Sequence, residues 1–386
     1  MGQRVAIVGT GQTHHRSSRK DVNGVELIQE ATSRALEDAG LRREDIDAVI
    51  IGNMDHFEGI NYVDMWSIDG NGGLHKPVMK VTTGGTTGTT VAIAGYYHVA
   101  SGLFDTVLAI GWEKNSESDT TAAIITCADP YWERPTFGGA VAGLATAACE
   151  YMHRYGITER DAALVAVRDR KNAIKNPYAH LRKQITVEEV LGSPILAYPI
   201  KLLDICPRTD GACAVIFASE DKAKKIADKP AWVHQVSSRH NYTFLTDIER
   251  SGRMPTLYEA CMEVYKNAGI RDPLHELDVI EMYTPSSFAG LVWIDALGVC
   301  DEGEAVKLVS DGATEMGGEL PINPSGGVIS TNCIGATGLI RVAEAAMQVS
   351  GRAGEHQIEG AKLALATGFG GCSWSDVLLI GSSKPN

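Results

Sequence analysis

The sequence lacks the patterns that mark several large classes of protein. Its eight cysteines include no C-x-x-C pair, so we expect neither structural disulfides nor a bound metal ion. Basic residues are outnumbered, 35 against 48 acidic ones, and the formal net charge of −13 argues against an extended nucleic-acid surface. Residues 3–9 read directly as a strand, and neither a signal peptide nor a membrane-spanning run is evident. We therefore expect a cytoplasmic protein that binds neither nucleic acid nor membrane.

Glycine, in contrast, is abundant, with 41 residues, and two glycine-rich turns echo each other. Residues 84–88 and 324–338 each lead into an alanine-rich helix that closes on a Ser-Gly pair. A buried strand that ends in glycine follows each helix, at 107–111 and 363–368. Such turns expose unpaired backbone N–H groups at a helix start, where an anion or a developing oxyanion can bind. The two turns therefore predict helix ends placed around one reaction centre.

The echo extends to a second pair of segments. Residues 30–52 and 258–283 each read as a helix, a glycine, a charged link and an apolar strand led by aspartate. This order is typical of loops that join a helix to a strand. Four matched landmarks in the same order indicate a tandem duplication of an α/β unit.

The duplication predicts how the chain divides. We expect two superposable halves, over residues 1–235 and 236–386, with an inserted region near 115–200 in the first half. The helices that follow the glycine-rich turns, over residues 85–102 and 335–351, are expected to pair at the centre of the molecule.

Four motifs in a fixed order point to a known family. They are Arg170–Ala179, Thr209–Ala212, Asn323–Gly327 and Ile334–Gly338. In this combination the chain resembles the thiolase superfamily, and most of all its sterol-carrier-protein-x and archaeal-type branch. The resemblance, which runs over nearly the whole chain, implies a duplicated five-layer α-β-α-β-α fold and acyl-CoA substrates. Coenzyme A is then a substrate, and no permanently bound cofactor is implied.

The resemblance also implies partners. Thiolases assemble as dimers or as dimers of dimers, so a homodimer core is expected. Members of this branch often pair with a small protein that carries a zinc ribbon and an OB-fold, and we expect such a partner. The benzoylsuccinyl-CoA thiolase of anaerobic toluene breakdown is one arrangement of this kind that the chain resembles.

The catalytic positions depart from the usual pattern of the family. Gly85 occupies the place of the nucleophilic cysteine at the first helix start, and Gly368 that of the late cysteine. Asn332 replaces the histidine before the second helix, and Cys333 replaces the proline that follows it. Tyr283 stands where the strand-end motif normally has a histidine. The resemblance therefore carries the fold but not the usual catalytic set.

Other residues are candidates to fill this gap. Cys333 lies at a helix start, where backbone N–H groups lower a thiol pKa and support an oxyanion. It is therefore the first candidate nucleophile, and the alternative interpretation is that it is an ordinary core cysteine. Cys372 and Cys127 are the second and third candidates. Asn332 is placed to hold an oxyanion or its water. His56, in a loop that follows a strand, is a candidate catalytic group, although a single histidine is more often incidental.

Two further groups of residues are predicted to bind substrate. For the oxyanion, we expect N–H donors from loops that contain Gly85, Gly370, Gly371 and Cys372. A basic segment over 170–183 stands out in an acidic chain and favours phosphate binding, with a solvated surface as the alternative. For CoA we therefore expect the side chains of Arg170, Lys171, Asn172, Arg182 and Ser325.

Three functions are open at this point, and we rank them in order. The first is carbon–carbon bond cleavage or formation on an acyl-CoA, above all thiolytic cleavage of a β-ketoacyl-CoA with a bulky or aryl acyl group allowed. The second is retro-aldol cleavage of a β-hydroxyacyl-CoA, which needs an acid/base such as Tyr283 but no covalent nucleophile, and so explains Gly85. The third is a non-catalytic subunit that scaffolds a neighbouring enzyme.

Overall fold

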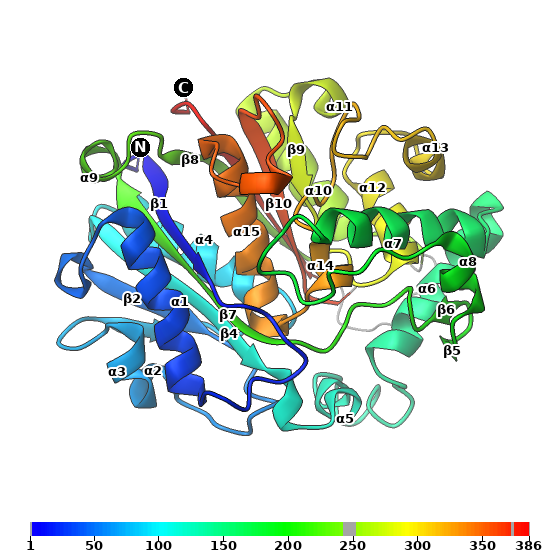
Figure 1. The fold of residues 1–386 in the computed structure, drawn as a ribbon, viewed down its shortest axis with the longest axis horizontal. Helices are drawn as coiled ribbons and strands as arrows, with labels where there is room; N and C mark the ends of the chain where they lie inside the picture. Colours follow the sequence, from blue (N-terminus) through cyan, green and yellow to red (C-terminus); the bar gives the residue numbers. More distant parts are fainter. Residues whose placement is uncertain (1, 242–251, 372–373, 386) are drawn as a thin grey trace.

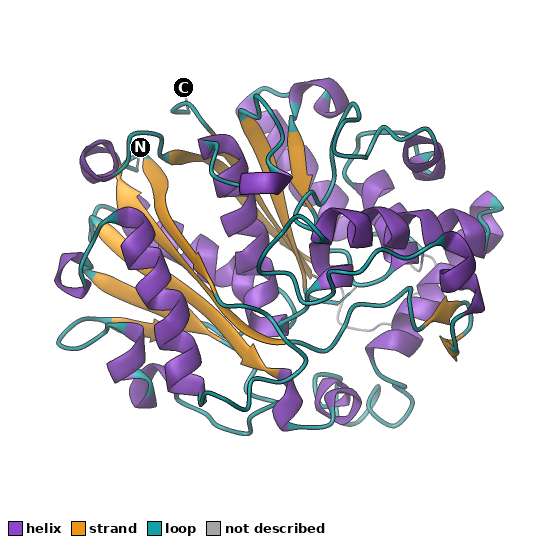
Figure 2. Ribbon diagram, viewed as in Figure 1, coloured by secondary structure: helices purple, strands orange, loops and turns teal. Residues whose placement is uncertain are grey.

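The computed structural model describes residues 2–241, 252–371 and 374–385. Within them one sheet of nine strands has the order β3-β2-β4-β7-β1-β8-β11-β10-β9 (Figures 1 and 2). The first half of the chain supplies β1 (Val5–Gln12), β2 (Ala48–Gly52), β3 (Val78–Lys80), β4 (Thr106–Lys114) and β7 (Asp210–Ser219). The second half supplies β8 (Ala231–His240), β9 (Val279–Glu281), β10 (Leu363–Phe369) and β11 (Trp374–Gly381).

Strand pairing follows the same plan in both halves, which confirms the predicted duplication. In the first half, β2 runs parallel to β4, β4 antiparallel to β7, and β7 antiparallel to β1. In the second half, β9 runs parallel to β10, β10 antiparallel to β11, and β11 antiparallel to β8. The two halves join where Ala6 and Ile7 of β1 pair with Trp232 and Ala231 of β8.

Helices on both faces of each half give the predicted layers α-β-α-β-α. The central layer is α4 (Thr87–Ala100) and α15 (Ile334–Ser350), and α15 contacts both β4 and β10. The outer helices are α1 (Gly24–Ala39), which packs on β1 and β7, and α10 (Pro255–Ala268), which packs on β8 and β11 (Figure 1). Successive strand residues alternate between layers, since Ile7 packs in the central-helix core and Val8 in the α1 core.

The local sequence explains where the outer helices begin and end. Asn23 and Glu26 form a reciprocal capping box at the start of α1. Pro255 stands in the first turn of α10, where its missing N–H costs nothing. Both helices end on a glycine in the left-handed region, Gly40 with φ 63° and Gly269 with φ 77°. These glycines are the landmarks that precede the aspartate-led strands.

The central helices cross where each carries a glycine. A Cβ atom on Gly88 would lie 2.5 Å from the backbone nitrogen of Leu339, and one on Gly338 would lie 2.5 Å from that of Thr89. The two backbones can approach this closely only because neither residue has a side chain. This contact confirms that the segments 85–102 and 335–351 pair at the centre of the molecule.

A long segment joins β4 to β7 over the range where the sequence predicts an inserted region, and its being an insertion stays a prediction. It contains α5 (Thr120–Ile125), α6 (Ala140–Tyr155), α7 (Glu159–Ala173), α8 (Val187–Gly192), β5 (Ile195–Ala197) and β6 (Ile200–Lys201). The helix α7 lies along elements of the second half: α12 (Ser287–Ala296), α13 (Ala305–Ser310) and α14 (Gly327–Ser330) (Figure 1). The predicted division after residue 235 falls inside β8. We propose that the halves divide instead in the link between α9 (Glu220–Ile226) and β8.

Short elements complete the described part of the chain. They are α2 (Val63–Trp66), α3 (Ile68–Asn71), α11 (Pro273–Glu276) and the 3-10 helices η1 (Arg43–Asp45), η2 (Asn115–Glu117) and η4 (Gly354–His356). Over the described residues, every helix is too short or too polar to cross a lipid bilayer.

Candidate active site

The site lies where the N-terminal ends of α4 and α15 meet the ends of β9 and β10. The turn before α4 lies against the loop after β10, because a Cβ atom on Gly85 would lie 2.4 Å from the Phe369 carbonyl oxygen and 3.7 Å from Gly370 Cα. On β10 itself, a Cβ atom on Gly368 would lie 2.0 Å from Thr89 Oγ1. Neither position where the resemblance places a family cysteine can therefore hold a side chain in this conformation.

Tyr283 and Asn332, two of the predicted site residues, lie together. Tyr283 follows β9, and its hydroxyl donates to Asn332 Oδ1 at 3.4 Å. Thr337, in the first turn of α15, donates its hydroxyl to the same oxygen at 2.9 Å. The Asn332 amide in turn donates from Nδ2 to the sulfur of Cys206 at 3.1 Å. Three side chains thus hold one carboxamide.

The backbone of Asn332 is held as firmly as its side chain. Its N–H donates to Thr209 Oγ1 at 3.2 Å, and its carbonyl accepts from Asn115 Nδ2 at 3.1 Å. The residue is only 8% exposed. A group restrained at both ends is suited to hold a reacting atom in one place.

Burial determines the protonation of the two acids beside Asn332. It raises the pKa of the Tyr283 phenol well above its usual range, with the nearby Cys206 sulfur as a further cause. Burial also raises the pKa of the Cys206 thiol to about 11, against the opposing effect of the Asn332 N–H. At neutral pH both groups are therefore uncharged, and Tyr283 is a proton donor.

Cys333 does not have the environment that its place at a helix start predicted. It is fully buried as the N-cap residue of α15, and its sulfur points to His15 Nδ1 at 3.4 Å. Burial raises the pKa of this thiol well above the usual value, where a lowered one was expected. Burial also lowers the pKa of His15 to about 3, so the imidazole brings no positive charge to support a thiolate. The helix position alone did not show that the side chain turns inward.

The other cysteine and histidine candidates lie elsewhere. His56 is exposed in the loop after β2, and its Nδ1 bonds to Thr126 Oγ1 at 3.2 Å. Cys127 is exposed just beyond α5. Among the described residues, neither side chain shares a hydrogen bond with Tyr283 or Asn332. Cys372 lies outside the described residues, whereas Gly371, with φ 76°, turns the chain before it.

The five residues predicted for CoA do not form one cluster. Asn172 donates to the Asn323 carbonyl at 3.1 Å, and Ser325 donates to the buried carboxylate of Glu281 at 2.7 Å. Arg170 is likewise buried, and burial lowers its pKa. The last two are exposed: Lys171, which pairs with Glu315 at 2.9 Å, and Arg182, whose guanidinium donates to the Ile174 carbonyl at 2.8 Å.

A buried carboxyl pair lies under the start of α15 and was not predicted from the sequence. Glu113, at the end of β4, accepts the N–H of Gly335 at 2.8 Å and that of Met54 at 3.1 Å. Glu58 lies beside it and accepts the N–H of Lys114 at 2.6 Å. Burial raises the pKa of Glu113 well above the usual value, and the neighbouring Glu58 adds to this effect. Burial raises the pKa of Glu58 as well, so each carboxyl of the pair is harder to ionise than an exposed glutamate.

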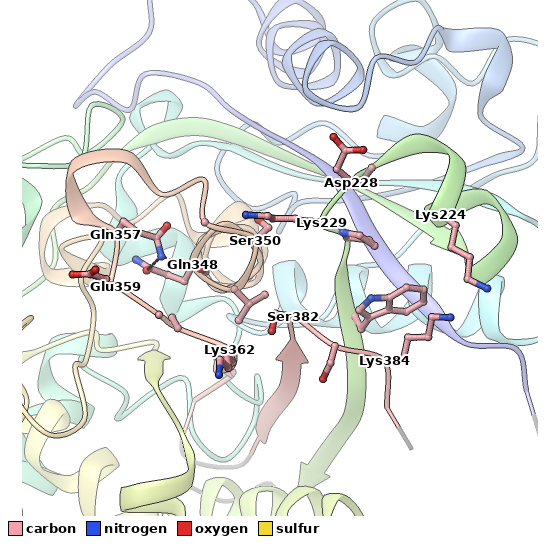
Figure 3. Close-up of a pocket in the computed structure, with 18 residues that line it drawn as sticks. Lys224, Asp228, Lys229, Gln348, Ser350, Gln357, Glu359, Lys362, Ser382 and Lys384 are labelled. Atoms are coloured by element: carbon pink, nitrogen blue, oxygen red, sulfur yellow. Dashed lines mark hydrogen bonds between the residues drawn. The ribbon is translucent and has the colours of Figure 1, made fainter.

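A cavity of about 1100 Å³ lies at the opposite, C-terminal end of α15 (Figure 3). Four lysines line it together with Asp228 and Glu359: Lys224, Lys229, Lys362 and Lys384. Two of these lysines, Lys224 and Lys384, each bind Glu220 at 2.6 Å. One carboxylate shared by two lysines leaves the lining with a surplus of positive charge, but the cavity lies at the end of α15 away from Tyr283 and Asn332.

Comparison with family models and curated proteins covers nearly the whole chain. Residues 5–221 match the thiolase N-terminal domain, and residues 231–383 match the thiolase C-terminal domain-like model. An acetyl-CoA acetyltransferase of Methanothermobacter thermautotrophicus is 33% identical over 95% of this chain and 96% of its own length. Sterol carrier protein 2 of Gallus gallus is 30% identical over 96% of this chain and 70% of its own. The benzoylsuccinyl-CoA thiolase subunit BbsB of Thauera aromatica is 28% identical over 92% of both chains.

Among solved structures, the fold is similar to that of the Ltp2-ChsH2(DUF35) aldolase. The TM-score is 0.84 and the sequence identity 25%, over 98% of each chain. The family models, the identities and the shared fold agree over nearly the whole sequence. They also agree with the resemblance drawn from its motifs. The chain belongs to the thiolase family.

Proposed function

We propose that the protein cleaves or forms a carbon–carbon bond in an acyl-CoA. The relatives support this prediction of a thiolase-type enzyme, since they include acetyl-CoA acetyltransferases and a benzoylsuccinyl-CoA thiolase subunit. The site supplies what such chemistry requires, a buried proton donor next to a fixed amide at the start of a helix.

Within this chemistry we propose retro-aldol cleavage of a β-hydroxyacyl-CoA, or its reverse. The observation that carries the proposal is the closed pair of glycines, Gly85 and Gly368, at the two positions of the family cysteines. A route through an acyl-enzyme has no thiol at either place, whereas a retro-aldol step needs none. The similarity to a solved aldolase of the same fold is a second support.

The reaction closes its own proton balance. The β-hydroxyl gives up its proton, the Cα–Cβ electron pair moves into the thioester enolate, and the β-carbon leaves as an aldehyde or ketone. Both proton transfers pass through one oxygen in the same step: as the bond breaks, Tyr283 Oη takes the β-hydroxyl proton and gives its own proton to the α-carbon, so the phenol is neutral before and after. Asn332 Nδ2 carries two N–H groups, of which Cys206 takes one, so the second is available to the enolate oxygen. Losing such a donor typically costs about 100- to 1,000-fold in rate.

Thiolytic cleavage of a β-ketoacyl-CoA is the second candidate, favoured by the named activities of the two relatives above. It requires a thiol that becomes acylated.

Two variants separate the candidates: Cys333→Ala and Tyr283→Phe. Each is assayed on β-hydroxyacyl- and β-ketoacyl-CoA esters, and an acyl-enzyme is sought by intact-mass trapping. We expect Cys333→Ala to keep a near-normal rate and Tyr283→Phe to lose it, with no acyl adduct. An acyl adduct on Cys333, lost in Cys333→Ala, would establish the thiolytic route. If the wild-type chain shows no activity on either class of ester, even with its partner protein present, the non-catalytic scaffold is favoured.

For the CoA moiety we propose the exposed part of the basic segment. Lys171 and Arg182 reach solvent, whereas Arg170, Asn172 and Ser325 use their polar atoms inside the protein. Calorimetry with acetyl-CoA should show that Arg182→Ala weakens binding several-fold. Unchanged binding in Arg182→Ala would place the phosphates elsewhere.

We propose a homodimer core and a small zinc-ribbon/OB-fold partner. The strand β3 is one of the two edges of the described sheet, and its Met79 is 50% exposed, close in sequence to the exposed Tyr62 and Met65. The relatives support a partner, because one is a named subunit and one solved structure combines Ltp2 with ChsH2(DUF35). Sedimentation of the wild-type protein and of Met79→Asp tests the dimer, and co-purification followed by zinc analysis tests the partner. A monomeric wild-type protein would count against the homodimer. Full activity of the isolated chain would count against the need for a partner.

A further inference from the structure

We propose that Cys206 is a positioning residue for the active-site amide. Its sulfur takes one N–H of Asn332 and thereby fixes the direction of the second N–H, the proposed donor to the enolate oxygen. This inference rests on the proposed function of Asn332. It deepens that proposal by naming the group that orients the donor.

The backbone brings Cys206 to the site from a distant part of the chain. Ile205 and Ser286 form an antiparallel bridge, and the N–H of Cys206 donates to the Pro285 carbonyl at 3.0 Å. The paired segment begins two residues after Tyr283. Ser286 also caps α12 by accepting the N–H of Ala289 at 3.2 Å. The sulfur is therefore held by the same strand-like pair that carries the phenol.

The adjacent side chains favour one orientation of the amide. Tyr283 and Thr337 both donate hydroxyl protons to Asn332 Oδ1. A flipped carboxamide would turn its N–H groups toward the two hydroxyls and its oxygen toward the Cys206 sulfur, so both hydroxyls and the thiol would have to exchange their donor and acceptor roles. Without the sulfur, one side of this arrangement has no acceptor. The amide then gains a second position in which its free N–H no longer points into the site.

The sulfur acts as a neutral acceptor rather than as a nucleophile. Its thiol is half-buried, and burial raises its pKa to about 11, so it is overwhelmingly protonated near neutral pH. A sulfur in this state is a weak hydrogen-bond acceptor that adds no charge beside a developing enolate. A serine hydroxyl can do the same, whereas alanine cannot.

The test is a double-mutant cycle between Cys206 and Asn332, measured as kcat and KM. Cys206→Ala is expected to lower kcat by about tenfold, the effect of losing one net hydrogen bond, with KM nearly unchanged. Cys206→Ser should recover most of the loss, and the exposed Cys149→Ala should have no effect. In the Asn332→Leu background, Cys206→Ala should cost nothing further. Additive losses, or a serine variant as slow as the alanine variant, would overturn the proposal.

A second measurement does not need activity and keeps the inference separate from the proposed function. The Asn332 N–H stabilises the Cys206 thiolate, so Asn332→Leu should slow iodoacetamide labelling of Cys206 and move its pH dependence upward. Labelling is followed residue by residue in peptide mass spectra, with Cys149 as the internal control. An unshifted profile would overturn the positioning role even in an active enzyme. A shifted profile in a protein that cleaves no β-hydroxyacyl-CoA would keep the contact and overturn the proposed reaction. An acyl adduct on Cys206 would overturn both.

Discussion

At the scale of single residues, the site depends on two positions that admit no side chain. Gly85 faces the Phe369 carbonyl oxygen and Gly368 faces Thr89 Oγ1, so each glycine allows another segment to come into contact with it. The neighbouring Gly84 differs, because a Cβ atom there would meet nothing within 4 Å. The two adjacent glycines therefore form a matched pair for mutation.

Gly85→Ala should destabilise the protein and Gly84→Ala should not. The added methyl group on Gly85 forces the loop after β10 to move, and overpacking of this kind typically costs about 1–3 kcal/mol. Chemical denaturation gives the free energy of unfolding of both variants, and the change in Gly84→Ala should stay within about 0.5 kcal/mol. Equal stability of the two variants would show that the loop does not close over Gly85.

Tyr283→Phe should remove the carbon–carbon bond chemistry while the fold remains. The variant keeps the aromatic ring, whose centroid lies 5.9 Å from that of the Phe369 ring, but it loses the proton donor. We expect kcat to fall by about 100-fold or more, as for other general acids. Tyr265→Phe is the control, since this hydroxyl is also buried and donates to the Leu297 carbonyl rather than to Asn332. A Tyr283→Phe enzyme as fast as the control would exclude the phenol as the acid.

At the scale of elements, the active site depends on the crossing of α4 and α15. Gly338→Ala would place a methyl group 2.5 Å from the backbone nitrogen of Thr89, where a rigid helix cannot yield. We expect a loss of about 1–3 kcal/mol in the free energy of unfolding and also a fall in kcat, because Asn332 lies two residues before the start of α15. Gly192→Ala, at the end of α8 with nothing within 4 Å, is the control and should be neutral. Full activity in Gly338→Ala would mean that the helices need not cross so closely.

The start of α15 also predicts a pH dependence of stability. The folded-state pKa of Glu113 is raised, so the folded protein binds more protons than the unfolded chain above about pH 4.5, and stability falls as pH rises through this window. Glu113→Gln keeps an acceptor for Gly335 but cannot ionise. Between pH 5 and pH 8 the variant should therefore gain on the wild type by up to about 1.4 kcal/mol per pH unit. A difference in stability that does not change with pH, as expected for the exposed Glu355→Gln, would contradict the raised pKa of Glu113.

At the scale of the whole molecule, the layers could be predicted because the duplication repeats its turn chemistry. Gly40 and Gly269 end equivalent helices, and Asp-led strands follow both. Side-chain direction was less accessible. The position of Cys333 at a helix start does not reveal that its sulfur faces His15, and the basic segment over 170–183 does not reveal that a packed α7 buries Arg170.

Contacts between distant segments were also beyond the sequence. Tyr283 and Asn332 could be proposed because each lies in a recognisable motif. Cys206 could not, because it is 126 residues from Asn332 and reaches it only through the bridge between Ile205 and Ser286. The same holds for the closed environment of Gly85, which depends on a loop almost 300 positions further along the chain.

The central claim, carbon–carbon bond cleavage without an acyl-enzyme, is tested most directly by leaving out free CoA. A retro-aldol step consumes none, whereas thiolysis consumes one CoA for each bond broken. The full chain, with any co-purifying partner, is incubated with β-hydroxyacyl-CoA esters such as 3-hydroxy-3-phenylpropionyl-CoA. Our account predicts aldehyde and acetyl-CoA in equal amounts without added CoA, and none with Tyr283→Phe. Cleavage of acetoacetyl-CoA only when CoA is supplied, with no cleavage of the hydroxy esters, would contradict it.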